Sequence, residues 1–446
     1  MNHPKITSIK EKMAAGQALR KKLGRTNHSG FRRADASTDV LSSVKRANVG
    51  RVPGLIPLKM GRMALSPFSF FRGSAPLMAK DLSTLPVSGL KVQICGDAHV
   101  HNLGAYAAPD GHLVFDLNDF DETIPGPWEW DAKRLASSIV LAGREAGCSN
   151  AVCSQAVQSM VRCYRASMHE FCQMSVLELT RFEIRRVNAT PAVKDILHKA
   201  ERVTPARVLS KLTVNVKGLP RFHDRPPVLR HVPALVAAQV LKALRDYRAT
   251  LGANRQLIFD SYTLVDVAFK VVGTGSVGTR DYVVLLLGNG IGDPLFIQVK
   301  EAIASCYEPF LPKAHVIHNH GQRVAQGQQR MQSVSDPFLG WTTMKDRHYL
   351  VRQLADHKAS LDPQDLKRGV LLDYSMVCGE VLAKSHARTG NAGMLAGYGG
   401  NSDKLDKAIA SFAQAYADQT ERDYAKFMKA IRSGKIKAEK GFIREV

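Results

Sequence analysis

Residues 92–122 constrain the fold of this chain more than any other stretch, and they read VQICGDAHVHNLGAYAAPDGHLVFDLNDFDE. The segment begins as a short apolar strand, passes through a Pro-Asp-Gly turn and returns as the strand HLVFDL. Asp97 and Asn102 follow the first strand, and Asp119 and Asp121 follow the second. We therefore expect two adjacent strands to bring carboxylates and an amide to one edge, where such oxygen ligands suit a metal ion held against phosphates.

The helix and strand patterns around this segment predict an α+β fold with several units. The 446 residues are enough for a substantial core and for two or three lobes. We expect a basic N-terminal arm over residues 1–50, a helical unit that carries the polar loops over 51–258, and a strand-rich unit over 259–360. Helices over 361–446 are expected to pack back on the helical unit.

The chain carries a formal net charge of +22, and the excess of basic residues is concentrated near its front. Residues 1–62 contain fourteen Lys or Arg against three Asp or Glu. We expect acidic partners, namely a nucleotide and, through the arm, nucleic acid or another anionic surface, although a solvated arm explains the same charges. No apolar run reaches the ~20 residues that span a bilayer, and the front carries no secretory pattern. With seven cysteines and no CxxC pair, we expect a cytoplasmic protein.

A glycine-rich motif lies about 170 residues beyond the polar segment. Gly273, Gly275 and Gly278 form a GxGxxG pattern, which is followed by the strand-like text TRDYVVLLLG rather than by a helix. This context favours a hairpin of the protein-kinase type, whose backbone N–H groups cover nucleotide phosphates, over a dinucleotide-binding turn. A plain Gly-rich hairpin is the alternative. Lys300 ends the next strand, PLFIQVKEA, where a kinase places the lysine that pairs with the α- and β-phosphates.

The polar segment fits the same chemistry. Asp97 and Asn102 are five positions apart, which is the interval between the base and the metal-binding Asn of a kinase catalytic loop. Asp119 follows a strand and precedes a Phe, as a Mg²⁺-binding Asp does in kinases. A rival interpretation uses His99 and His101, which together with the nearby carboxylates would bind Zn²⁺ or Mn²⁺ in a metal-dependent hydrolase. That interpretation leaves the Gly-rich loop and the lysine without a role.

The motifs GDAHVHN, NDFDE, GPWEWD and RLA together resemble the HGDxHxxN…IDFE…DP…DLA signature of aminoglycoside phosphotransferase-like kinases. The resemblance implies that Asp97 is the catalytic base, that Asn102 and Asp119 bind the metal, and that Asp131 braces the catalytic loop. The text CGEVLAKSHAR at 378–388 resembles the helix that precedes this loop in those kinases, but here it lies near the C-terminus. We therefore expect a protein-kinase-like two-lobe fold that is circularly permuted, which is tolerable where the joined ends lie close together at the surface.

Residues ~50–430 are also similar to an uncharacterised bacterial family, the domain of unknown function numbered 2252. The similarity is carried by GRMALSPFSFFRGSA, CGDAHVHNLG, FDLNDFDETIPGPWEWDAKRLASS, GTGSVGTR, QVKEA and SDPFLGW. One feature departs from the kinase pattern, because the helix after Lys300 contains several Gln but no Glu that would hold the lysine. We expect Glu301 or Glu308 to take that place, or Lys300 to be positioned otherwise.

These features together predict an ATP- and Mg²⁺-dependent phosphotransferase that acts on an unidentified hydroxyl-bearing acceptor. A nucleotide-binding, pseudokinase-like module without catalysis is the first alternative, and the metal-dependent hydrolase is the second. His99, Asp121 and Arg72 are expected to support the site, with Arg72 either an anion contact or a structural residue. The segments 203–230 and 389–402 are expected to shape the acceptor pocket.

Overall fold

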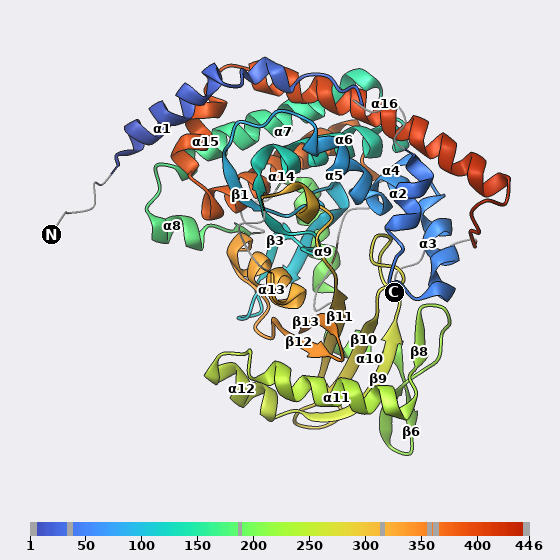
Figure 1. Ribbon diagram of the computed structural model, residues 1–446. Helices are drawn as coiled ribbons and strands as arrows, with labels where there is room; N and C mark the ends of the chain where they lie inside the picture. Colours follow the sequence, from blue (N-terminus) through green and yellow to red (C-terminus); the bar gives the residue numbers. More distant parts are fainter. Residues whose placement is uncertain are drawn as a thin grey trace.

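The computed structural model describes residues 7–33, 39–185, 190–312, 317–354, 359 and 365–439. The protein is a mixed α+β structure, as predicted, with a helical lobe in the upper part of Figure 1 and a strand-rich lobe below it. The expected boundary between residues 360 and 361 lies outside the described residues. No helix in the described part of the chain is long and apolar enough to cross a membrane.

The helical lobe draws its helices from both ends of the chain. These helices are α1 (Ile9–Ala18), α2 (Val40–Arg46), α3 (Ile56–Met63), α4 (Pro67–Gly73), α5 (Ala75–Ser83), α6 (Trp128–Glu145), α7 (Asn150–Phe171), α8 (Val176–Arg181), α9 (Pro191–Glu201), α14 (Arg368–Thr389), α15 (Ala392–Gly399) and α16 (Lys404–Arg432). Its short strands are β1 (Lys91–Ile94), β2 (Leu103–Ala107), β3 (Leu113–Leu117), β4 (Ile124–Pro127) and β5 (Ile184–Arg185).

Helix α6 forms the centre of this lobe. The sequence predicts an amphipathic helix that opens at Asp131, but α6 begins three residues earlier, at Trp128, and almost all of its residues are buried. The reason is that α7 and α16 pack along it and α14 and α4 also contact it, so that no face is left to solvent. Helix α7 begins where the hydroxyl of Ser149 accepts a hydrogen bond from the backbone N–H of Val152.

The polar segment forms two small sheets rather than the single hairpin that we expected. Strand β1 pairs with β4, and β2 pairs with β3 through the predicted Pro-Asp-Gly turn. Strand β2, which follows Asn102, was missed because its text LGAYA carries no alternation of polar and apolar residues. The loop after β1 and the loop after β3 nevertheless meet, since the backbone N–H of Asn118 donates to the carbonyl oxygen of Asn102.

The strand-rich lobe contains α10 (Pro205–Leu212), β6 (Thr213–Val216), β7 (Leu219–Phe222), β8 (Leu229–His231), α11 (Ala234–Arg248), α12 (Ala253–Asp260), β9 (Thr263–Lys270), β10 (Asp281–Leu287), β11 (Pro294–Ala302), α13 (His320–Met331), β12 (Gly340–Met344) and β13 (Arg347–Gln353). Its main sheet is antiparallel and has the order β12-β13-β11-β10-β9-β8. The sequence after residue 260 predicts three antiparallel strands, and the stretches FLGWTT and HYLVRQLAD predict a strand pair. Both predictions are confirmed.

This lobe begins earlier in the chain than the predicted boundary at 258/259. Strand β8 is the edge strand of the sheet. Helix α11 packs on the sheet against β12 and β9, and its residues Val240, Leu244 and Tyr247 share one buried core with Val267 of β9. The sequence could not show this, because an apolar helix face looks the same whether it covers a helix bundle or a sheet.

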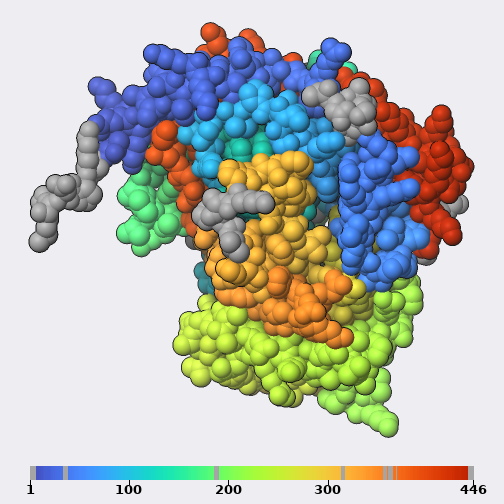
Figure 2. Space-filling view, viewed as in Figure 1, coloured from blue at the N-terminus to red at the C-terminus, as the bar shows by residue number. Residues whose placement is uncertain are grey.

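The N-terminal arm is docked on the helical lobe instead of standing free in solvent. Figure 2 shows these residues, in blue, lying along the helical lobe beside the red C-terminal helix. Arg20 and Arg25 donate to backbone carbonyls of α15, and His28 lies 2.7 Å from the hydroxyl oxygen of Tyr398. Part of the arm's positive charge is thus used inside the protein rather than offered to nucleic acid.

Arg33 is the strongest of these attachments. Its guanidinium group makes bidentate ion pairs with Asp81 of α5 and Asp423 of α16. Both carboxylates are buried, and the Arg33 side chain is 9% exposed. We expect Arg33→Met to lower the free energy of unfolding by about 3–5 kcal/mol, because two carboxylates lose their counter-charge in the interior. Urea unfolding measures the change.

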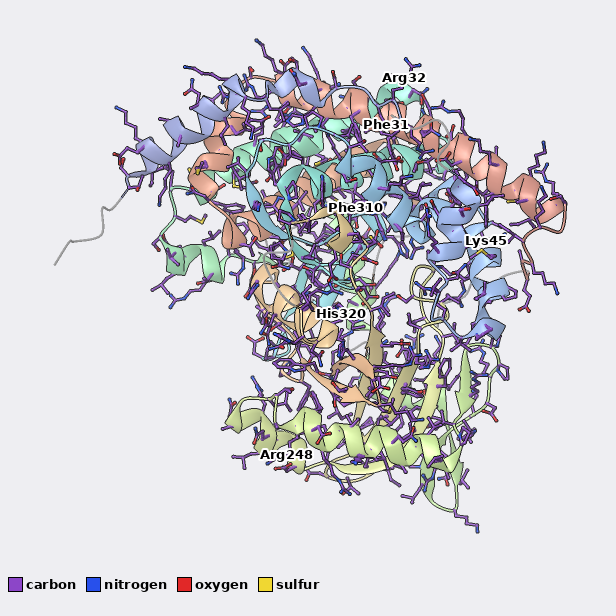
Figure 3. All side chains as sticks on the ribbon, in the orientation of Figure 1. Phe31, Arg32, Lys45, Arg248, Phe310 and His320 are labelled. Carbon is purple, nitrogen blue, oxygen red and sulfur yellow. The ribbon has the colours of Figure 1, made fainter. Side chains whose placement is uncertain are left out.

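The matched control is Arg32→Met. Arg32 is exposed at the outer edge of the molecule (Figure 3), so its loss should change the unfolding midpoint very little. Equal midpoints for the two variants would contradict the assigned role of Arg33.

Candidate functional site

The first polar loop, which follows β1 and contains Asp97 and Asn102, is anchored by Asp131 in the first turn of α6. Its Oδ2 accepts a hydrogen bond from the backbone N–H of Cys95 at 2.6 Å, and its Oδ1 accepts from the N–H of Gly96 at 2.8 Å. Gly96 has φ +79°, and a Cβ there would lie 2.5 Å from the carbonyl oxygen of Glu122, so only glycine fits this turn. His386 of α14 lies behind the carboxylate, with Nε2 3.4 Å from Oδ2.

Asn102 joins the two polar loops. Its Nδ2 donates to the carbonyl oxygens of Asp97, at 3.0 Å, and Asp119, at 2.9 Å. Its Oδ1 accepts from the backbone N–H of Asp119 at 2.7 Å. The amide therefore sets the spacing between the two aspartates, and one lone pair of its oxygen is already used.

Asp97 is held by an arginine that the sequence analysis did not single out. Arg134 Nε donates to Asp97 Oδ1 at 2.7 Å, and His99 Nε2 lies 3.8 Å from Oδ2. The Asp97 side chain is 25% exposed and lines the cavity described below. Burial raises the pKa of Asp97 despite the opposing effect of Arg134. Burial, together with Arg72 and Arg134, keeps the pKa of His99 well below its ordinary value, so this imidazole is neutral.

Lys300 lies at the meeting point of the two lobes. It extends from β11, and its Nζ is 2.6 Å from Asp121 Oδ2 and 3.6 Å from Asp119 Oδ1. Burial alone would lower the pKa of Lys300, but the two carboxylates outweigh it and raise that pKa. Burial and the neighbouring charge of Asp119 raise the pKa of Asp121, although Lys300 acts in the opposite direction.

The Gly-rich loop joins β9 to β10 and closes over these groups. Ser276 Oγ donates to Asp121 Oδ2 at 3.1 Å, so the loop touches the carboxylate pair directly. Gly273 and Gly278 have positive φ values of 63° and 92°, which other residues rarely adopt. The far side of the loop is held by the helical lobe, because the N–H of Val52 donates to the Gly278 carbonyl at 2.7 Å and Arg62 donates to that of Gly273.

Glu301 does not hold Lys300. Successive side chains of a strand point to opposite faces, and the carboxylate of Glu301 accepts hydrogen bonds from Arg280 and Arg347 instead. The carboxylates at Lys300 are those of the polar segment. Helix α13 carries no Glu. Its Arg323 donates hydrogen bonds to the backbone carbonyl oxygens of Asp121, at 2.8 Å, and of Thr123.

A buried carboxyl group lies next to the lysine in the sheet. Asp281 of β10 pairs in register with Lys300 and accepts a hydrogen bond from Gln298 on Oδ2 at 2.7 Å. Its Oδ1 is buried and has no hydrogen-bond partner among the described residues. Burial raises the pKa of Asp281 from 3.8 to about 6, against the lowering effect of Lys300 and Lys270.

This raised pKa predicts a pH dependence of stability. Between pH 3.8 and about 6 the folded protein keeps a proton that the unfolded chain releases, so the contribution of Asp281 to the free energy of unfolding falls as pH rises through this window. Asp281→Asn cannot ionise, and we expect its stability relative to wild type to rise by about 3 kcal/mol across the window. Urea unfolding at several pH values measures this difference. The exposed turn variant Asp346→Asn should track wild type, and a flat difference for Asp281→Asn would contradict the raised pKa.

A cavity of about 1050 Å³ lies between the lobes and unites most of the predicted site. Phe310, labelled near the centre of Figure 3, contributes to its lining from the connection between β11 and α13. The predicted residues among its lining are Arg72, Asp97, His99, Asn102, Asp119, Asp121, Gly273, Gly275, Lys300 and Glu301. Asp131 is buried behind the loop that it anchors. Segment 203–230 also contributes lining residues, whereas α15, within 389–402, packs on α1 instead.

The metal cluster that the rival hydrolase interpretation requires is not assembled in the described part of the chain. Asp116 points into the helical lobe, where it forms a buried ion pair with Lys384 of α14. Among the described residues, no group of three or more His, Cys, Asp or Glu side chains is arranged to hold a metal ion. His99, one of the two histidines proposed as metal ligands, instead lies beside Asp97 and packs edge-on against Phe68.

Two arginines of the candidate site were not identified by sequence analysis, for different reasons. Arg134 lies three positions after Asp131, and this i,i+3 spacing on one helix face was a signal that could have placed both at the same loop. Arg323 lies on a helix about 200 residues beyond its partners, and no local pattern could have paired them.

Comparison with known proteins identifies the family of the chain. A family model described as an uncharacterized protein conserved in bacteria (DUF2252) matches residues 51–430. The comparisons with curated proteins and with solved structures found no match. The matched range contains both polar loops, the Gly-rich loop and Lys300, and it covers most of the chain. The chain therefore belongs to the DUF2252 family.

Proposed function

We propose that this protein is an ATP- and Mg²⁺-dependent phosphotransferase that acts on a hydroxyl group. The observation that carries the proposal is the meeting of Lys300 with Asp119 and Asp121 beneath the Gly-rich loop, on a cavity that also contains Asp97. A bound nucleoside triphosphate needs this combination. Its phosphates need a cation and backbone N–H groups, its metal needs carboxylates, and its acceptor needs a base.

The order of elements in the strand-rich lobe supports the proposal. The Gly-rich loop lies between the antiparallel strands β9 and β10, the lysine lies on the next strand, β11, and helix α13 follows it. Protein kinases have the Gly-rich loop, the lysine strand and the following helix in this order. Because the polar loops precede this lobe in the sequence, a kinase-like architecture here would be circularly permuted, with α14 to α16 completing the helical lobe.

The residues present fit Mg²⁺. This ion takes one or two protein carboxylates together with phosphate oxygens and water, and Asp119 and Asp121 provide two neighbouring carboxylates. Asn102 Oδ1 has a second lone pair for the same ion. When bound, the metal would neutralise charge on the β- and γ-phosphates.

The chain's own groups account for the remaining steps. Lys300 would turn from Asp121 to the phosphates, and the Gly-rich loop would cover them with backbone N–H groups. Arg134 fixes Oδ1 of Asp97 and leaves Oδ2 for the proton of the acceptor hydroxyl, and burial makes this carboxylate a stronger base. The acceptor oxygen then forms a bond to the γ-phosphorus while the bond to the bridging oxygen breaks and ADP leaves.

A nucleotide-binding module without catalysis is the second candidate. It is favoured by the ion pair between Arg134 and Asp97, which engages the base, and by Arg323, which occupies the helix where a kinase places a Glu.

The test is thermal unfolding of the wild-type protein with ATP, with Mg²⁺ and with both, followed by transfer of labelled γ-phosphate to a panel of hydroxyl compounds. A ligand at 100 times its Kd adds about 2.7 kcal/mol of stability, which gives a visible shift. We expect a shift that requires both components, and phosphate transfer to at least one acceptor. A shift without ATP consumption or transfer would favour the second candidate, and no shift in a folded protein would overturn both.

A further inference from the structure

One wall of the cavity, which belongs to the helical lobe, is strongly basic. It is formed by α2 to α5 and the loops between them, and it carries Arg46, Arg51, Lys59, Arg62, Arg72 and Lys80. Among the described residues that line the whole cavity, thirteen are Lys or Arg and six are Asp or Glu. The proposed nucleotide site uses only Lys300 among these basic residues, so it does not account for the excess of positive charge.

The basic residues at the start of this wall have neutral partners. Lys59 is 1% exposed, and its Nζ donates to the amide oxygen of Asn48 at 3.2 Å. Arg51 donates to the carbonyl oxygens of Ala47 and Val277. Arg46, Arg51 and Lys59 take part in no ion pair with the described carboxylates. Burial and the charge of Arg51 hold the pKa of Lys59 well below its ordinary value, against the weaker effect of Glu122.

Burial disfavours the charged form of an amine that has no ion-pair partner, and groups perturbed in this way gather at functional sites. An anion that binds from the cavity would stabilise the charged form of Lys59. Nucleotide phosphates are not that anion, because the arginines next to Lys59 hold the carbonyl side of the Gly-rich loop. The N–H groups that would face a nucleotide are on the loop's other edge.

The basic wall extends through Arg72 to Asp97, where the acceptor hydroxyl would bind. A Cβ on Gly275, at the tip of the Gly-rich loop, would lie 3.5 Å from the carbonyl oxygen of Arg72. The charge of Arg72 also acts on both Asp97 and His99. A molecule whose hydroxyl group reaches Asp97 therefore has the rest of its body against the basic wall.

Resting on the proposed function, we propose that the phosphoryl acceptor is itself an anion, a small hydroxylated phosphate ester whose phosphate binds at Lys59 and Arg46. The size of the cavity suits a nucleotide together with one small molecule, and this favours a small ester over a nucleic acid. Phosphate carries the double negative charge that matches several Lys and Arg donors.

The experiment measures the affinity for inorganic phosphate and for glycerol 2-phosphate by thermal unfolding at constant ionic strength, with and without ATP–Mg²⁺. The variants are Lys59→Met and Arg46→Met. The matched control is Lys45→Met, which changes an exposed residue of the same helix on the right of Figure 3. We expect both anions to stabilise wild type and the control, and the affinity to fall about tenfold or more in the two variants. Because Lys59→Met removes a buried polar amine that has no ion-pair partner, its melting temperature without anions should equal or exceed that of wild type.

The outcomes separate this inference from the function on which it rests. Stabilisation by phosphate that depends on Lys59 but occurs without any effect of ATP–Mg²⁺ would support the anion site and overturn the phosphotransferase. Stabilisation by ATP–Mg²⁺ with no added effect of either phosphate compound would overturn the anion site alone. A short RNA that binds through Lys59 and Arg46 more tightly than glycerol 2-phosphate would also overturn the small-ester proposal.

Discussion

The Asp119→Asn variant is expected to lose the Mg²⁺-dependent part of ATP binding and to slow phosphate transfer by a factor on the order of 10²–10³ or more. Asp119 lies near the start of the loop that follows β3, where its backbone N–H and carbonyl groups are both hydrogen-bonded to the side chain of Asn102. The substitution keeps the shape of the side chain and these backbone hydrogen bonds, so it removes charge without moving the loop. The remaining carboxylate, Asp121, is already 2.6 Å from Lys300, and it cannot by itself neutralise a divalent ion.

Thermal unfolding with ATP, with and without Mg²⁺, measures the binding effect, and labelled phosphate transfer measures the rate. Wild type should gain about 2.7 kcal/mol at 100 times the Kd, and the variant should gain much less. The control is Asp110→Asn, which makes the same change on the exposed turn between β2 and β3, where the side chain is 70% exposed. If Asp119→Asn and Asp110→Asn responded to ATP–Mg²⁺ equally, the metal role of Asp119 would be wrong.

The second large effect is expected for Asp131→Asn, which should lower the free energy of unfolding by about 3 kcal/mol. Both carboxylate oxygens of Asp131 accept hydrogen bonds from backbone N–H groups, those of Cys95 and Gly96, and the residue is fully buried. An Asn has one oxygen only, so its NH₂ group would face a donor and leave a buried N–H without an acceptor. Desolvation of that N–H and loss of the charge add to each other.

Urea unfolding gives the change in stability, and hydrogen exchange shows where it acts. The amides of Cys95 and Gly96 should exchange faster in the variant. The exchange rates of the central amides of β10 should change only by the amount that the change in global stability predicts. Asp110→Asn again serves as the control. A variant with wild-type stability and protected amides at Cys95 and Gly96 would show that Asp131 does not brace the loop.

Local elements of this fold were predictable where one pattern dominates. Strands β9, β10 and β11 are apolar, rich in β-branched residues and separated by glycine turns, and they occur where predicted. Helix α13 also lies within the stretch after β11 where the sequence predicts a helix. The family assignment was also correct, because long motifs in one order are specific.

Sequence analysis was less successful where partners come from distant parts of the chain. Residues 1–50 look like a solvated arm by composition, yet Arg33 is buried between Asp81 and Asp423, which lie 48 and 390 positions away. Helix α11 was assigned to the helical unit because its apolar face does not indicate whether a helix or a sheet covers it. In the same way, the sequence offered only Glu301 or Glu308 as partners for Lys300, or another way of positioning it. In the structure the lysine pairs with Asp119 and Asp121, and Glu301 pairs with Arg347.

Residue types and short spacings were thus enough to name Asp97, Asn102, Asp119 and Lys300, which all line the cavity, since glycine turns, strand ends and the five-residue interval from Asp97 to Asn102 are local properties of the chain. The pairing of those groups was decided only in three dimensions. Lys300 meets Asp121, Arg134 meets Asp97, and Lys59 meets no carboxylate among the described residues. The physical reason is that the strength and sign of an ionic contact depend on distance and burial, and the packing of the two lobes sets both.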